Sequence, residues 1–166
     1  MYHRLIAKPL SVNKSFFLFG PQGTGKTAWL KSLTMPTLYF DLLEAKWRLL
    51  FLANPQRLSE YIPPDFTGWV ILDEIQKVPE LLDEVHRLIE KYHYRFILSG
   101  SSVRKLYKKG VNLLAGRALT YYFHPLIAEE LGAAFDLTHY LQLGGLPSTY
   151  VDEDPQRNYL LLIFAD

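Results

Sequence analysis

The sequence predicts an α/β fold of three layers, in which helices cover both faces of a mostly parallel sheet of five strands. The first observation behind this prediction is that four apolar runs recur along the chain, at residues 15–20, 37–43, 69–74 and 95–100. They lack polar alternation, which is typical of strands that are buried on both faces. The second observation is that helical patterns lie between the runs. The length of 166 residues is enough for a sizeable core.

The clearest helical pattern is PELLDEVHRLIEKY, at residues 79–92. Its apolar residues recur at helical spacing and predict one buried stripe, made of Leu81, Leu82, Val85, Leu88, Ile89 and Tyr92. Pro79 suits the first turn of such a helix. Further along, the pattern predicts a short helix, a fifth strand and two more short helices, at residues 101–110, 118–126, 125–132 and 136–145. We therefore divide the chain into a core at residues 1–124 and a short helical segment at residues 125–166.

The turn GPQGTGKT, at residues 20–27, follows the first apolar run and opens the helical pattern KTAWLKSL. It matches the pattern GxxxxGK[ST], and a strand before it and a helix after it are the context that this pattern requires. Its backbone N–H groups would surround a phosphate at the positive end of the helix, while Lys26 would reach the β- and γ-phosphates. The Thr27 hydroxyl would bind Mg²⁺. The expected nucleotide-binding residues are Pro21, Gln22, Gly23, Thr24, Gly25, Lys26, Thr27 and Ala28. The alternative is a glycine-rich turn with a solvated Lys26.

Two carboxylates, Asp73 and Glu74, end the third apolar run. Ligands of open α/β sheets bind at the carboxyl ends of the strands, so both side chains are expected near the phosphate loop. This arrangement resembles a Walker B motif, in which Asp73 would hold Mg²⁺ and Glu74 would activate the water that attacks the γ-phosphate. In the alternative interpretation, Asp73 caps the next helix and Glu74 is a surface acid.

The fourth run also ends in hydroxyl side chains, within FILSGSS. Ser99 is expected at the position called sensor 1, where a polar group touches the γ-phosphate or the attacking water. We favour Ser99 over its neighbours, because Ser101 or Ser102 fits better as the cap of a following helix.

Five segments in order, GPQGTGKT, VILDEIQKVPELL, RFILSGSS, LAGR and GGLPSTY, resemble the bacterial and archaeal AAA-type ATP-binding proteins that carry an appended C-terminal domain of unknown function. The resemblance covers residues 15 to about 150 and implies a P-loop NTPase core with strand order 5-1-4-3-2 that binds ATP and Mg²⁺. It makes Arg117 a candidate finger for the γ-phosphate, and it allows this finger to act on a neighbouring subunit. Members of this family continue well past residue 166, so the chain is expected to lack most of the region after the core.

Composition limits the remaining function classes. A formal net charge of +1 does not indicate a nucleic-acid-binding protein. One basic cluster is more typical of a solvated helix face than of a nucleic-acid contact; it consists of Arg104, Lys105, Lys108 and Lys109. The absence of cysteine excludes disulfides, thiol catalysis and thiolate metal sites, and it suits the cytoplasm. The five histidines show no ligand spacing for zinc. We find neither a signal peptide nor an apolar run of transmembrane length.

The leading hypothesis is Mg²⁺-dependent ATP hydrolysis that drives or regulates a protein partner, with a homo-oligomer as one possible assembly. A second is a nucleotide-gated interaction module that binds ATP with little turnover. A third is a GTPase or a small-molecule kinase. It is weaker, because DFTG at residues 65–68 precedes the strand that it should follow and NKSF at residues 13–16 lacks the aspartate of a guanine-reading motif.

Overall fold

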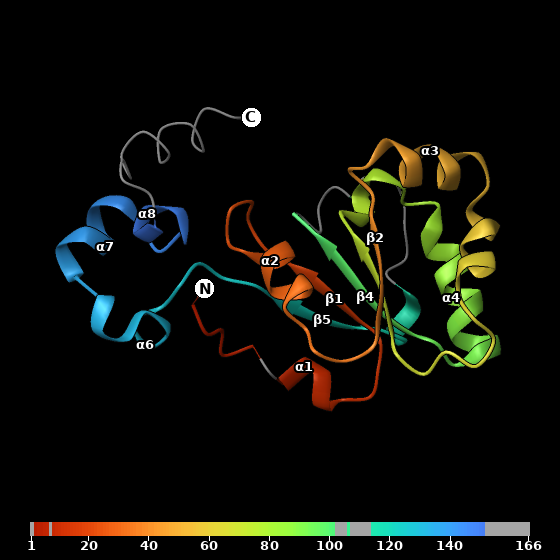
Figure 1. The fold of residues 1–166 in the computed structure, drawn as a ribbon, viewed down its shortest axis with the longest axis horizontal. Helices are drawn as coiled ribbons and strands as arrows, with labels where there is room; N and C mark the ends of the chain where they lie inside the picture. Colours follow the sequence, from red (N-terminus) through yellow and green to blue (C-terminus); the bar gives the residue numbers. More distant parts are fainter. Residues whose placement is uncertain (1, 7, 102–105, 107–113, 152–166) are drawn as a thin grey trace.

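The computed structural model describes residues 2–6, 8–101, 106 and 114–151. Its centre is a sheet of five strands: β1 (Phe16–Phe19), β2 (Thr37–Asp41), β3 (Trp69–Asp73), β4 (Arg95–Gly100) and β5 (Leu119–Tyr122). The strands lie in the order β2-β3-β4-β1-β5, and all four neighbouring pairs are parallel. This confirms the predicted α/β fold and the implied order 5-1-4-3-2, read from the opposite edge (Figure 1).

Helices cover both faces of the sheet, which explains why the strands lack polar alternation. Along β1, Phe17 and Phe19 belong to one apolar core and Phe16 and Leu18 to the other, and all four are at most 1% exposed. The first core includes buried residues of three helical elements: α3 (Ala45–Ala53), the 3₁₀ helix η1 (Pro55–Tyr61) and α4 (Leu81–Tyr92). The second includes residues of α1 (Lys8–Ser11) and α2 (Lys26–Lys31). Strand residues therefore alternate between two cores rather than between core and solvent.

Helix α4 buries most of the predicted stripe, at Leu81, Leu82, Val85 and Leu88. Tyr92 departs from the prediction, since its side chain is 44% exposed. It is the last residue of the helix, His93 follows in the left-handed conformation, and the Tyr92 ring stacks on that of Tyr94. The short helix predicted at residues 101–110 lies largely outside the described residues, and so do Ser102 and the four residues of the basic cluster.

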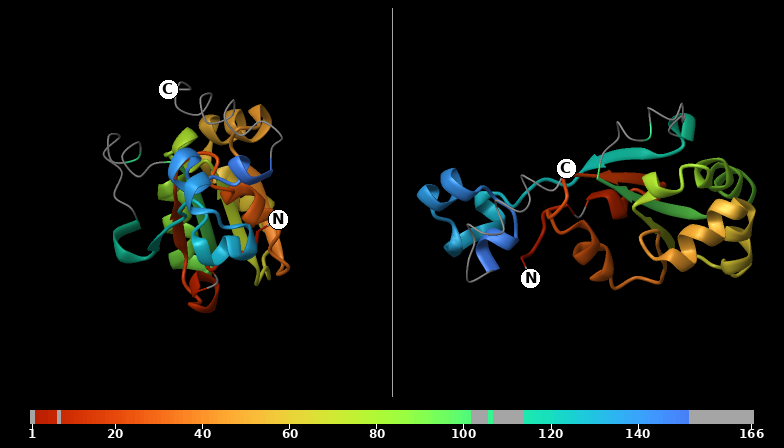
Figure 2. Two further views of the ribbon diagram at one scale, coloured as in Figure 1. Left: turned by 90° about the vertical axis from the view of Figure 1, so that its left-hand side faces the viewer. Right: turned by 90° about the horizontal axis from the view of Figure 1, so that it is seen from above.

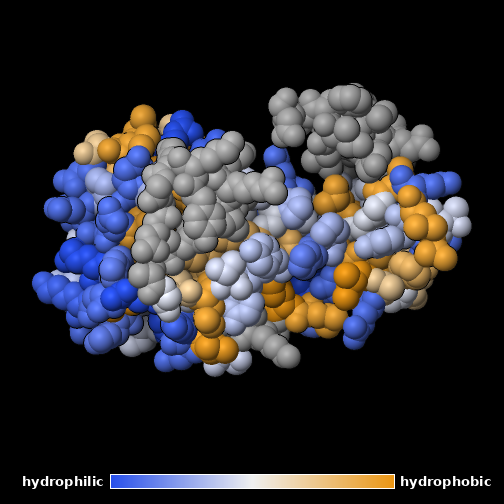
Figure 3. Space-filling model, turned by 180° about the vertical axis from the view of Figure 1, so that it is seen from behind, coloured by the Kyte–Doolittle hydropathy of each residue, from blue (hydrophilic) through white to orange (hydrophobic). Residues whose placement is uncertain are grey.

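The C-terminal part contains α6 (Ala128–Leu131), the 3₁₀ helix η4 (Gly132–Ala134), α7 (Leu137–Leu143) and α8 (Ser148–Val151). These helices lie beside the sheet rather than on either of its faces (Figures 1 and 2). Apolar side chains are exposed on this part, at Leu137, Leu141 and Val151, whereas the opposite end of the molecule is mostly hydrophilic (Figure 3). Within the described residues, no helix has the length and apolar character that crossing a membrane requires.

Candidate functional site

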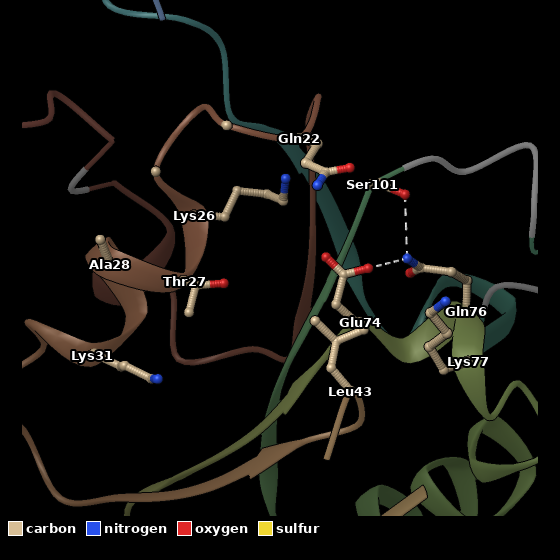
Figure 4. A pocket seen from close by; sticks show the side chains of 12 residues that line it. Gln22, Lys26, Thr27, Ala28, Lys31, Leu43, Glu74, Gln76, Lys77 and Ser101 are labelled. Carbon is tan, nitrogen blue, oxygen red and sulfur yellow. Dashed lines mark hydrogen bonds between the residues drawn. The ribbon is translucent and has the colours of Figure 1, made fainter. Parts of the chain in front are cut away.

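A cavity of about 860 Å³ opens at the carboxyl edge of the sheet, beside the ends of β1, β3 and β4. Side chains of the glycine-rich loop and of α2 face those that follow β3 across this cavity (Figure 4). The lining residues are Gln22, Gly23, Gly25, Lys26, Thr27, Ala28, Lys31, Leu43, Glu74, Gln76, Lys77 and Ser101. Six of the eight predicted nucleotide-binding residues are among them; Pro21 and Thr24 are not.

The loop backbone depends on its glycines for two different reasons. Gly25 has a φ of 91°, a conformation that side chains disfavour. Gly20 lies against the end of β5, where a Cβ atom would meet the carbonyl oxygen of Phe123 at 2.1 Å. Thr24 braces the loop from inside, because it is fully buried and its hydroxyl donates to the Pro21 carbonyl at 2.9 Å. These contacts support the shape of the loop from within the chain.

Lys26 lies beneath the loop and is only 6% exposed. Its Nζ donates to the carbonyl oxygens of Gly20 at 2.6 Å and Pro21 at 2.9 Å. Burial lowers the pKa of Lys26, and the nearby carboxylates of Glu74 and Asp73 oppose that shift. The ammonium group is thus held at the loop by two backbone carbonyl oxygens.

Asp73 joins the loop to the sheet. It is 1% exposed, and its carboxylate accepts hydrogen bonds from Thr27 Oγ1 at 2.7 Å and from the Tyr39 hydroxyl at 2.5 Å. Burial, followed by the hydrogen bond to Asp73, raises the pKa of Tyr39 above its ordinary value. A hydroxyl and a carboxylate beside a phosphate loop are oxygen ligands of the kind that Mg²⁺ takes together with substrate phosphates. Among the described residues, no three His, Cys, Asp or Glu side chains group as a metal site, so phosphate and water would have to complete the coordination.

Ser99 is fully buried and donates a hydrogen bond to Asp73. Its oxygen also accepts from the backbone N–H of Glu74 at 3.4 Å. Ser101 lines the cavity, whereas Ser99 does not. The contact of Ser99 with the γ-phosphate or with water stays a prediction. In this structure Ser99 forms hydrogen bonds with the Asp73 carboxylate and with the Glu74 backbone.

Glu74 takes an unusual backbone conformation directly after β3, with a φ of 62°. This left-handed conformation is uncommon for residues other than glycine, and outliers of this kind cluster at functional sites. The Glu74 carboxylate accepts a hydrogen bond from Gln76 Nε2, and both residues line the cavity (Figure 4). No motif in the sequence pointed to Gln76, nor to Tyr39, Lys31 and Lys77.

Comparison with known proteins identifies the family. A family model described as AAA domain matches residues 12–132. The chain belongs to the AAA domain family. It is therefore an AAA-type P-loop chain of the ATP-binding class. Among curated proteins, no sequence matches it.

One similar solved structure is that of the Aeropyrum pernix ORC1 protein in complex with DNA, with 16% identity and a TM-score of 0.47. The match covers 90% of this chain and 52% of that one, so this AAA chain spans about half the length of the ORC1 chain.

Arg117 lies far from the cavity of its own AAA chain. It stands two residues before β5, whose first residue, Leu119, pairs with Phe16 at the start of β1, whereas the loop follows the end of β1. The length of a strand therefore separates Arg117 from the loop. Arg117 forms an ion pair with Glu90 on α4. An action of Arg117 on its own site is incompatible with this position, and the proposal of action on a neighbouring subunit stays a prediction.

The N-terminal segment of the AAA chain contacts both the phosphate loop and the C-terminal helix α6. Arg4 donates to the Thr24 carbonyl at 2.9 Å, to the His124 carbonyl at 2.5 Å and to the Glu130 carboxylate at 3.1 Å. The Arg4 and Glu130 side chains are 7% and 6% exposed. A Cβ atom on Gly25 would lie 3.7 Å from the ring of Pro147, so the C-terminal part also approaches the loop directly.

Proposed function

We propose that this AAA chain binds ATP together with Mg²⁺ and hydrolyses the bond to the γ-phosphate. The observation that carries the proposal is the hydrogen bond of 2.7 Å between Thr27 Oγ1 and Asp73 Oδ2. This hydrogen bond joins the last residue of the phosphate loop to the carboxyl end of β3. Lys26 and Glu74 line the same cavity. The residue types and the order of the motifs are those of phosphoryl-transfer sites.

Each residue has a separate role in the proposed reaction. Backbone N–H groups of residues 22–28 would hold the phosphates, and Lys26 would exchange its carbonyl partners for β- and γ-phosphate oxygens. Thr27 and Asp73 would hold Mg²⁺, which when bound supplies positive charge that offsets the negative charge on the phosphates. Pro21 has no N–H, so its contribution is the carbonyl that orients Lys26.

Glu74 would act as the general base. It would take a proton from a water molecule as the water oxygen bonds to the γ-phosphorus. The bond between that phosphorus and the bridging oxygen of the β-phosphate then breaks. The products are ADP and inorganic phosphate, and the proton on Glu74 returns to solvent. Ser99 supports this step by holding the Glu74 backbone and the Asp73 carboxylate in place.

A second candidate function is the nucleotide-gated interaction module. The contacts of Arg4 and the approach of Pro147 to Gly25 favour it, because they place helices with exposed apolar side chains next to the phosphate loop. Nucleotide binding at the loop could then change how these helices meet a protein partner, or a second copy of this chain, with little turnover. The preference for adenine, the protein partner and the cytoplasmic location belong to the proposal as well; the cysteine-free sequence supports the location.

The test is to measure phosphate release and nucleotide binding together, with ATP and GTP, in the presence of Mg²⁺ or of EDTA. We expect Mg²⁺-dependent release from ATP, and a decrease of roughly 100-fold or more in Glu74→Gln with nucleotide affinity retained. Glu60→Gln is the matched control, because Glu60 is exposed and lies outside the cavity. Tight binding without release would favour the interaction module, and preferred release from GTP would overturn the assignment to ATP.

A further inference from the structure

Gln76 holds the residue that the proposed function makes the general base. Its side-chain nitrogen donates to the Glu74 carboxylate and also to Ser101 Oγ at 3.2 Å (Figure 4). Glu74 follows β3, and Ser101 follows β4. The Gln76 amide therefore links the ends of two neighbouring strands at the wall of the cavity.

The backbone conformation after β3 places the side chains of Glu74 and Gln76 side by side at the cavity. Ile75, Gln76 and Lys77 form the 3₁₀ helix η2, which is closed by a hydrogen bond of 2.9 Å from the Lys77 N–H to the Glu74 carbonyl. Ile75 is fully buried in the core and anchors this turn. The residues on either side of Ile75 line the cavity instead. The left-handed conformation of Glu74 begins the turn and so sets the direction of its carboxylate.

The carbonyl end of the Gln76 amide is buried on the side away from Glu74 and Ser101. Oε1 is buried and has no hydrogen-bond partner within the part of the chain that the structure describes. It packs against Gly100, where a Cβ atom would come within 2.5 Å of it. A buried oxygen without a partner costs free energy. The amide keeps this orientation because its nitrogen donates hydrogen bonds to Glu74 and Ser101. These two hydrogen bonds offset the cost of the unpaired oxygen.

We propose that Gln76 is a positioning residue for hydrolysis, which holds the Glu74 carboxylate at the point where it activates water. Gln76 acts through Glu74, so its loss leaves ATP bound but leaves the base misplaced. The inference rests on the proposed function, since it assigns Glu74 the role of base. It adds a residue that the phosphate-loop and carboxylate motifs do not include.

The decisive variant is Gln76→Glu, which keeps the size of the side chain but replaces the donor with a second carboxylate that repels Glu74. We expect kcat to fall roughly tenfold to 100-fold, the range for a catalytic group that has lost its support. The fall in kcat should exceed any fall in ATP affinity, although the added carboxylate at the cavity wall also repels the phosphates. Gln56→Glu is the matched control, because Gln56 is exposed and lies outside the cavity. Gly100→Ala, which displaces Oε1, should lower kcat in the same way.

A double-mutant cycle separates positioning from general damage to the fold. In the Glu74→Gln background the base is already absent, so Gln76→Glu should lower turnover little further. Turnover of Gln76→Glu equal to that of Gln56→Glu would overturn the inference, and so would an equal fold-decrease in both backgrounds. If wild type and Glu74→Gln release phosphate equally slowly, the proposed function itself fails and the role of Gln76 fails with it. That comparison does not involve Gln76, so the two failures are distinguishable.

Discussion

Thr27 and Asp73 are 46 residues apart in the sequence, yet the Thr27 hydroxyl donates to the Asp73 carboxylate at 2.7 Å. The contact exists because β1 and β3 both end at the same edge of a parallel sheet, separated only by β4. It joins the two sequence motifs on which the proposed Mg²⁺ site depends.

Asp73→Ala should remove the dependence of ATP affinity on Mg²⁺. The variant lacks the carboxylate, so Thr27 alone cannot hold the ion between the protein and the phosphates. The measurement is an equilibrium titration with labelled ATP, with Mg²⁺ and with EDTA. Asp83→Ala, on the exposed side of α4, is the control and should behave as wild type. Equal affinity of the wild type with and without Mg²⁺ would rule out this metal assignment.

Arg4→Ala should destabilise the protein much more than an ordinary surface substitution. Removing one partner of a mostly buried ion pair leaves Glu130 without its cation, which costs about 3 kcal/mol. For a chain of this size the melting temperature should fall by roughly 6 to 12 °C. Arg57→Ala is the matched control, because Arg57 pairs with Glu60 at the surface, with side chains that are 42% and 58% exposed, and exposed pairs contribute little to stability. Equal melting temperatures for the two variants would show that the Arg4 contacts do not stabilise the fold.

Arg117→Ala should lower turnover while leaving ATP affinity nearly unchanged, if Arg117 serves the site of a neighbouring subunit. An arginine finger contributes roughly 10³-fold or more to the rate. Specific activity of the wild type should then rise with protein concentration, as subunits meet. Mixing Arg117→Ala with Glu74→Gln should restore some activity, because each variant supplies the group that the other lacks. If specific activity is independent of concentration and Arg117→Ala has normal turnover, Arg117 has no catalytic role and its ion pair with Glu90 is structural.

Local patterns were enough to predict the strands and the edge of the sheet at which the motifs meet. Apolar runs indicated β1, β2, β3 and β4, and the polar residues that follow β1, β3 and β4 predicted the position of the cavity. The strand order needed the family resemblance, because periodicity does not determine which strands are neighbours.

The missed residues depend on contacts that no local pattern contains. Tyr39 reaches Asp73 only because β2 pairs with β3 in a particular register, and the two residues are 34 apart in sequence. Arg4 and Glu130 are 126 residues apart. Helix α3 gave a weak pattern because apolar residues lie on both of its sides: Phe51 is fully buried and Leu49 is 62% exposed. Gln76 had a local signal, its place two residues after Glu74, but its role depends on the unusual backbone between them.

The most direct test of the account is equilibrium binding of labelled ATP to wild type and to Lys26→Ala in the presence of Mg²⁺. Lys91→Ala serves as the control, because Lys91 is exposed at the end of α4 and lies outside the cavity. We expect saturable binding by wild type and by Lys91→Ala. The affinity of Lys26→Ala should be at least about 100-fold lower, since charge-assisted hydrogen bonds to phosphate are lost. Unchanged affinity in Lys26→Ala would contradict the assignment of residues 20–27 as the phosphate-binding loop.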